Sequence, residues 1–146
     1  MEAIGQDVLL ILINKKLLER KFPGTVYGKD REGRPCFQGA FRSTAGLELY
    51  TLRLVLPSGS PTVAPRLYVW DPIKLPMRQG GFLNDHPSQH RWHTCPAGPE
   101  GRVQICHALS WDPSYAYVEV FLKGILWLEA YRAHLDTGKS ICDYFR

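Results

Sequence analysis

Six side chains that can act as nucleophiles, proton carriers or metal ligands are concentrated in one short stretch of the chain. Four of the five histidines and two of the four cysteines fall between positions 86 and 107. They are His86, His90, His93, Cys95, Cys106 and His107. A thiolate near an imidazole can serve as a nucleophile, and the same side chains are preferred ligands of zinc. Three explanations follow, which differ in the role of Cys106.

The first explanation is a nucleophilic cysteine. Cys106 ends a short apolar segment, residues 103–106, that is typical of a buried strand, and a helix is expected soon after it. Nearby imidazoles and helix amino ends lower the pKa of a thiol and so favour the reactive thiolate. His93 lies thirteen residues upstream, a distance that a folded loop can close. His107 is adjacent, but neighbours in an extended segment point to opposite sides.

The second explanation is a zinc site. Its candidate ligands are His86, His90, His93 and Cys95, with Cys106 and His107 completing the set. The ligand types fit, but the chain has no C-x-x-C pair and its spacings match no common zinc module. The third explanation is a solvated loop around an inert, buried cysteine, because free cysteine often serves only to pack. Composition and spacing alone favour this third explanation.

The elements that must position these side chains indicate a small α+β domain. Residues 4–22 are predicted to form a helix that Pro23-Gly24 ends. Its apolar stripe consists of Val8, Leu9, Leu12, Ile13 and Leu17. Strands are expected at residues 36–42, 47–56 and 66–70, with spacings that suit an antiparallel meander. In the second strand one face carries Tyr50, Leu52, Leu54 and Leu56.

The cluster itself lies in and just after the one irregular part of the chain. Residues 74–101 are rich in proline and glycine, and an irregular stretch of this length in a small domain is often functional. A second long helix is predicted after it. Asp112-Pro113 is a start signal for that helix, and Gly138 is a stop signal.

Length and composition fit one domain over residues 1–146. The net charge is +4 with no dense basic run, so a nucleic-acid partner is not expected. The longest apolar run, residues 8–13, is too short to span a membrane, and no basic segment precedes it as in a signal peptide. We therefore expect no membrane partner, a cytoplasmic location and four reduced cysteines.

Residues 101–113, Gly-Arg-Val-Gln-Ile-Cys-His-Ala-Leu-Ser-Trp-Asp-Pro, resemble the active-site stretch of ubiquitin-conjugating enzymes. In that family a Gly-x-Ile-Cys motif is followed by Trp-x-Pro and then by a helix. The predicted order of elements also agrees with the family's fold. The tail around residues 127–131 and 137–139 resembles the prokaryotic members encoded in antiviral defence operons. The resemblance covers nearly the whole chain in topology and is specific only over residues 101–131.

This resemblance implies that Cys106 receives a protein C-terminus as a thioester and passes it to an amine or thiol acceptor. No cofactor and no metal are implied. The cargo would be a ubiquitin-like protein or the C-terminus of a cyclic-oligonucleotide synthase, as in the related antiviral systems, and an activating enzyme is a further expected partner. Lys15, Lys16 and Arg20 on the first helix form a candidate docking surface, or simply a solvated helix face.

The chain departs from the family at the His-Pro-Asn motif, whose asparagine stabilises an oxyanion about ten residues before the cysteine. Here His86-Pro87 is followed by Ser88 and lies twenty residues upstream. We expect His93 to replace that function or to position the amine. Candidate accessory residues are Cys95, as a regulatory disulfide partner of Cys106 or a second acceptor thiol, together with His107, Asn84 and Trp111, the last expected to fix the loop.

The alternative function is a non-catalytic protein-interaction module on the same fold, stabilised by zinc in the His/Cys-rich loop. This module would bind its partner without using the thiol of Cys106. A conjugating enzyme would instead form a covalent, reducible adduct on that thiol.

Overall fold

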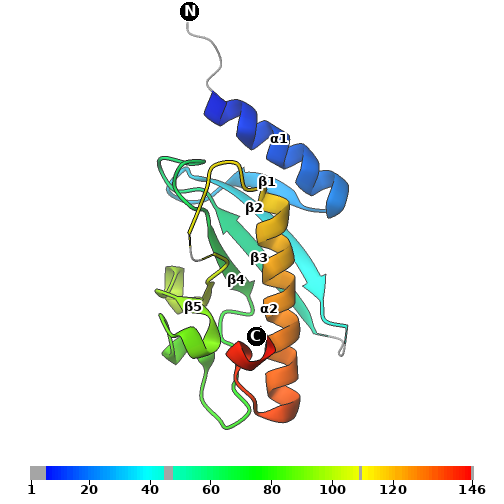
Figure 1. Ribbon diagram of the computed structural model, residues 1–146, viewed down its shortest axis with the longest axis vertical. Coiled ribbons are helices and arrows are strands. Elements are labelled where there is room, and N and C mark those ends of the chain that lie inside the picture. Colours follow the sequence, from blue (N-terminus) through cyan, green and yellow to red (C-terminus); the bar gives the residue numbers. More distant parts are fainter. Residues whose placement is uncertain (1–5, 45–47, 109, 146) are drawn as a thin grey trace, which may run out of the picture.

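The chain folds as an α+β domain, described in a computed structural model at residues 6–44, 48–108 and 110–145. Helix α1 (Gln6–Lys21) is followed by a six-stranded antiparallel sheet and then by helix α2 (Tyr117–Thr137), and a 3₁₀ helix, η4 (Ile141–Tyr144), follows α2 (Figure 1). The strands are β1 (Val26–Lys29), β2 (Pro35–Arg42), β3 (Leu49–Val55), β4 (Arg66–Asp71), β5 (Thr94–Cys95) and β6 (Gln104–Ile105). Their order in the sheet is β1-β2-β3-β4-β6-β5. The predicted α+β class and the antiparallel meander are confirmed.

The core lies between one face of the sheet and α2. The predicted inward face of β3 is confirmed, since Tyr50, Leu52 and Leu54 are all buried. Helix α2 approaches this face closely at Gly124, where an added Cβ would lie 2.7 Å from Leu67 Cδ2 and 2.9 Å from Leu52 Cδ1. Glycine is needed at this position because a larger residue would push the helix off the sheet.

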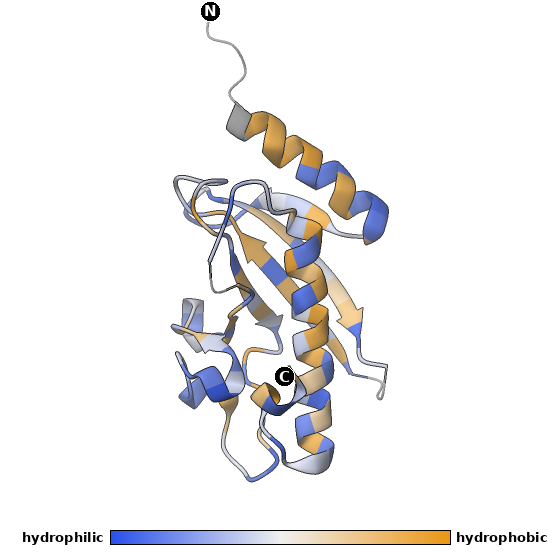
Figure 2. Ribbon diagram, in the orientation of Figure 1, coloured by the Kyte–Doolittle hydropathy of each residue, from blue (hydrophilic) through white to orange (hydrophobic). Residues whose placement is uncertain are grey.

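Helix α1 does not bury the apolar stripe that its sequence suggests. Leu12 and Ile13 are 48% and 53% exposed, and Val8, Leu9 and Leu17 are also exposed. The helix is instead held by its opposite side, where Leu18 is buried and Asn14 Oδ1 accepts a hydrogen bond from the Tyr117 backbone N–H at 2.8 Å. Apolar residues cover much of α1, which extends beyond the sheet (Figure 2).

Helix α2 begins later than its start signal predicts. Asp112 Oδ1 accepts hydrogen bonds from the backbone N–H and the hydroxyl of Ser114, at 2.8 and 2.6 Å, and so forms a turn instead of capping the helix. The helix starts at Tyr117 and its predicted end is confirmed, because Gly138 follows Thr137 with a φ of 80°. Within the described part of the chain, no helix combines the length and apolar character needed to cross a bilayer.

The irregular stretch before the cysteine motif is ordered into short elements. Three 3₁₀ turns, η1 (Leu83–Asp85), η2 (His90–Trp92) and η3 (Pro99–Gly101), surround the two-residue strand β5. Trp92 anchors η2 in the core, where its backbone carbonyl accepts a hydrogen bond from Trp127 Nε1 of α2 at 2.9 Å. The histidines of this stretch therefore extend from an ordered backbone.

Candidate functional site around Cys106

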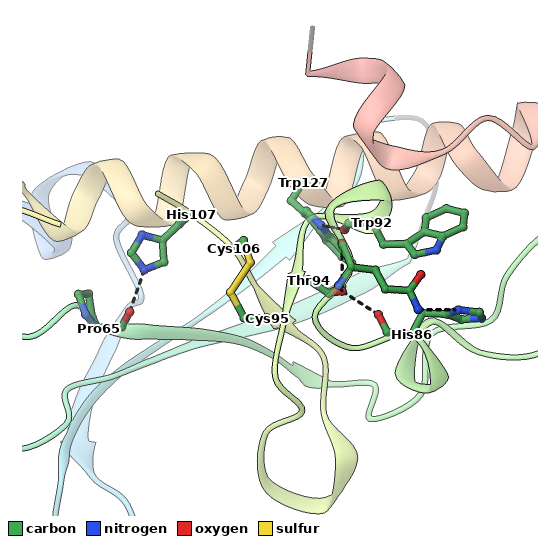
Figure 3. Close-up of a disulfide and its surroundings, with 9 residues drawn as sticks. Pro65, His86, Trp92, Thr94, Cys95, Cys106, His107 and Trp127 are labelled. Atoms are coloured by element: carbon green, nitrogen blue, oxygen red, sulfur yellow. Dashed lines mark hydrogen bonds between the residues drawn. A yellow bond between two sulfur atoms is a disulfide. The ribbon is translucent and has the colours of Figure 1, made fainter. Parts of the chain in front are cut away.

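The site is built on the last two strands of the sheet. Strands β5 and β6 pair with Thr94 opposite Ile105, and the Cys106 backbone N–H donates a hydrogen bond to the His93 carbonyl at 2.9 Å. This pairing brings the two cysteines together from opposite ends of an irregular loop. Cys95 and Cys106 form a disulfide, with their Cα atoms 5.4 Å apart (Figure 3). The expectation of four reduced cysteines is thus wrong for this pair, because the strand register places both sulfurs on the same side.

Both sulfurs lie on the wall of an open cavity of about 660 Å³. Cys95 and Cys106 are half-buried, so neither is enclosed in the apolar core. The other residues that line the cavity are Ser88, His90, His93, Thr94, Pro96, His107, Ala108 and Lys123. The structure therefore brings Cys106 together with three of the predicted histidines, in a space that could admit a peptide segment.

His93 occupies a strained position on this wall. It follows η2 in the left-handed region, with a φ of 50° and a ψ of 45°. Its ring packs against His90 and Phe145, each with centroids 4.9 Å away. Burial, and secondarily the charge on His90, lowers the pKa of His93. Among the described residues, its buried Nε2 has no hydrogen-bond partner.

His107 and Trp111 tie the segment after Cys106 to the turn before β4. His107 Nε2 donates to the Pro65 carbonyl at 2.8 Å, as Figure 3 shows, and Trp111 Nε1 donates to the Pro61 carbonyl at 2.8 Å. Burial lowers the pKa of His107, and the positive charge of Lys123 acts in the same direction. Both rings thus connect this segment to the backbone of the turn before β4.

The side chain of Asn84 holds the fold together through hydrogen bonds to the backbone. Its Oδ1 accepts a hydrogen bond from the Leu75 backbone N–H at 2.9 Å, and its Nδ2 donates to the carbonyls of Ile73 and Gly101 at 2.6 and 2.9 Å. The residues that line the cavity with Cys106 do not include Asn84. Its amide thus joins the two ends of the irregular stretch, and these contacts leave it little capacity to stabilise an oxyanion.

Sequence reasoning missed Cys142. This residue lies in η4 at the other end of α2, and its Sγ is 3.4 Å from His90 Nε2. Among the described residues, the one group of three or more potential metal ligands is His90, His93 and Cys142. The zinc set predicted from the loop is therefore not assembled, because Cys95 and Cys106 bond to each other and His107 binds a carbonyl. No spacing in the sequence links position 142 to position 90.

The candidate docking residues on α1 differ in their availability. Lys15 forms an ion pair with Glu19 at 3.6 Å and lies 5.5 Å from the centroid of the Tyr27 ring. Lys16 and Arg20 are exposed. They share the helix with the exposed apolar residues, so α1 presents a mixed apolar and basic surface.

Comparison with models of protein families, with curated proteins and with solved structures finds no match.

Proposed function

We propose that the chain is a ubiquitin-conjugating-type enzyme that carries a protein C-terminus as a thioester on Cys106. The observation that carries the proposal is the position of Cys106, which follows β6 on the wall of an open cavity. It lies in the segment 101–113 that resembles the family's active-site stretch, with Ile105-Cys106 and a Trp-x-Pro after it, although Gly101 stands two residues farther from Ile105 than in the family's Gly-x-Ile-Cys motif. An inert packing cysteine would lie in the core, as Cys36 does at 7% exposure. Cys106 is half-buried instead and shares its cavity with histidines.

The arrangement of elements supports the same proposal. An amino-terminal helix, a four-stranded antiparallel meander, an irregular segment that bears the cysteine and a long helix follow each other in the order expected of a ubiquitin-conjugating fold. The two short strands β5 and β6 extend the meander at one edge, and Cys106 directly follows β6. In this proposal the cavity over Cys106 receives the extended C-terminus of the cargo.

The chemistry consists of two acyl transfers. In the first, the Cys106 thiolate attacks the carbonyl carbon of a thioester, the new S–C bond forms, and the donor's thiolate leaves. In the second, an acceptor amine or thiol attacks the carbonyl carbon, a new N–C or S–C bond forms, the bond to Cys106 breaks so that it leaves as thiolate, and the acceptor releases its proton to solvent. We assign to His93 the positioning of the acceptor, because its ring lines the same cavity.

The disulfide defines which form of the protein is competent. Cys106 Sγ cannot form a thioester while it is bonded to Cys95, so transfer requires the reduced pair. A cytoplasmic location, which we propose for the enzyme, would favour the reduced form. Cys95 is then a regulatory partner or a second acceptor thiol, as the sequence suggested.

The proposed partners are proteins. The cargo is a ubiquitin-like protein or the C-terminus of a cyclic-oligonucleotide synthase, in an antiviral signalling context, and an activating enzyme supplies it. Helix α1 is the proposed docking surface for that partner. Its exposed apolar stripe and the neighbouring Lys16 and Arg20 suit a protein with an apolar and acidic patch.

The test is a trapping experiment with the reduced protein, an activating enzyme and a candidate cargo. We expect an adduct that reductant removes, that is absent in Cys106→Ala, and that becomes resistant to reductant in Cys106→Ser, where the ester replaces the thioester. Cys95→Ser is the matched control and should still form the adduct. A fully reduced, folded protein that forms no adduct with any cargo would contradict the proposal.

The second candidate is a non-catalytic interaction module, and the specific observation in its favour is that Cys106 is engaged in a disulfide. In this case the disulfide stabilises the edge hairpin and the cavity only binds a partner. Partner binding would then need no thiol on Cys106: it would persist without an adduct in Cys106→Ala, and reduction would affect it no more than that variant does, since both break the disulfide. The conjugating enzyme predicts instead an adduct that requires the reduced pair and is absent in Cys106→Ala.

A further inference from the structure

Three potential ligand atoms for a metal ion meet beside the cavity of Cys106. One atom each from His90, His93 and Cys142 lies within 4.8 Å of the other two. The two histidines come from the loop around η2, and the cysteine comes from η4 beyond helix α2. We infer that these three residues form a zinc site, and this inference does not depend on the transfer activity proposed for Cys106.

The spacing within the cluster suits coordination by one small ion. Zinc binds thiolate sulfur at about 2.3 Å and imidazole nitrogen at about 2.0–2.1 Å, so two ligands of a tetrahedral ion lie roughly 3.5 Å apart. His90 Nε2 and Cys142 Sγ are 3.4 Å apart. The third ligand atom, from His93, lies within 4.8 Å of both, so binding of the ion would require it to move closer to them.

A simple thiol–imidazole hydrogen bond would account for only part of this arrangement. It explains the contact between His90 and Cys142, but it gives no partner to the nitrogen atoms of His93, whose ring packs against His90. The buried Nε2 of His93 has no hydrogen-bond partner among the described residues. Its imidazole therefore has bonding capacity that the surrounding protein leaves unused, which is unusual for a buried polar group.

The donor set selects the kind of metal. One thiolate and two imidazoles are soft or borderline ligands, which favour zinc over magnesium or calcium, whose sites consist of oxygen ligands. Three protein ligands also leave a fourth position of the tetrahedron for water or another molecule. His90 and His93 both line the cavity of Cys106, so that position would lie close to the cavity.

A bound ion would crosslink two parts of the chain that are far apart in the sequence. It would link η4 to the η2 loop, which Trp92 anchors from its other side through the hydrogen bond with Trp127. It would also fix the left-handed turn at His93. With one ring nitrogen bound to zinc, His93 would act in the transfer reaction by its position and not as a proton acceptor.

The experiment measures zinc and cobalt binding to the full chain after treatment with a chelator. The measurement uses the wild type and a Cys95→Ser/Cys106→Ser variant, which removes the competing thiols. We expect one zinc per chain in both proteins by elemental analysis. We also expect a thiolate-to-cobalt charge-transfer band with Co²⁺. His90→Ala and Cys142→Ser should each weaken zinc binding about tenfold or more.

Two further variants keep the inference falsifiable. His86→Ala changes a histidine of the same loop outside the cluster and should bind zinc like the wild type. Cys142→His preserves a ligand, so it should retain zinc while losing the cobalt–thiolate band. Zinc binding that is absent, or that survives Cys142→Ser and is lost only in the Cys95/Cys106 variant, would overturn the inference. Adduct formation on Cys106 is measured separately, so the two proposals can fail independently.

Discussion

Cys95 and Cys106 are joined across the β5–β6 edge of the sheet by a disulfide, with their Cα atoms 5.4 Å apart. Both residues line the same cavity, so the bond lies where the proposed thioester would form. The redox state of this pair therefore determines whether Cys106 is chemically available.

The first prediction concerns the reactivity of Cys106 in the native protein. Without reductant, and after a chelator has removed any metal bound at Cys142, an alkylating reagent should modify Cys142 but not Cys106, and Cys36 should resist because it is buried. In Cys95→Ser the thiol of Cys106 is freed, and its alkylation rate should rise at least about tenfold without any reductant. Peptide mass spectrometry after timed alkylation gives the rates. A Cys106 that stays unreactive in Cys95→Ser would mean that its sulfur is inaccessible.

The second prediction tests whether Asn84 has a structural or a catalytic role. Replacing it with alanine removes three hydrogen bonds to backbone groups around the irregular stretch. We expect the free energy of unfolding to fall by about 2–3 kcal/mol, because the backbone groups of Leu75, Ile73 and Gly101 lose their partner. Urea denaturation measures this loss.

The matched measurement for Asn84 is adduct formation on Cys106 at a temperature where Asn84→Ala is still folded. A structural role predicts that the rate of adduct formation stays within about twofold of the wild-type rate, since the amide does not line the cavity. A loss of two orders of magnitude in a folded variant would instead assign Asn84 to oxyanion stabilisation.

The sequence predicted the elements better than their contacts. The turn glycine at position 138, the alternation in β3 and the extended segment before Cys106 are local signals, and the structure contains each of the corresponding features. Strand β5 has only two residues and no apolar pattern of its own, so it exists because β6 offers it a partner. The pairing of Cys95 with Cys106 depends on that register and could not be deduced from spacing.

Two further differences between the sequence-based predictions and the structure arise from tertiary contacts and not from local sequence. The apolar stripe of α1 predicts a buried face, but burial depends on a partner surface, and the sheet is already covered by α2 along its core face. Cys142 approaches His90 only because α2 runs back along the domain and ends beside the η2 loop. Neither the exposure of the α1 stripe nor the contact between Cys142 and His90 can be predicted from a periodicity or a spacing in the sequence.

A third prediction follows from the buried imidazole of His107. Burial lowers its pKa below the ordinary value of 6.5, so just below that pH the unfolded chain binds a proton that the folded chain does not. The free energy of unfolding should therefore fall as the pH decreases from about 6.5 to the lowered pKa, and this contribution should level off below it. The slope from one such group is at most about 1.4 kcal/mol per pH unit.

The His107→Gln variant tests this assignment, because its amide can still donate to the Pro65 carbonyl but does not titrate. Urea unfolding of both proteins between pH 5 and 8 gives two curves, and their difference cancels the contribution of the other histidines. We expect the variant to lose less stability in acid than the wild type. Parallel curves would show that His107 keeps an ordinary pKa in the folded protein.

The last prediction concerns α1 as a docking surface. Leu12 is 48% exposed, so Leu12→Glu should change the free energy of unfolding by no more than about 0.5 kcal/mol. The charge would nevertheless oppose the burial of this stripe by a protein partner, and we expect adduct formation at limiting activating enzyme to slow about tenfold or more. Leu126→Glu is the matched control, since Leu126 is an apolar residue of α2 with 57% exposure that lies outside the proposed surface. Equal slowing of adduct formation by both variants would contradict the role of α1 in docking. Slowing confined to Leu12→Glu would support it. So would a rate of adduct formation that depends more strongly on salt in the wild type than in Lys16→Ala.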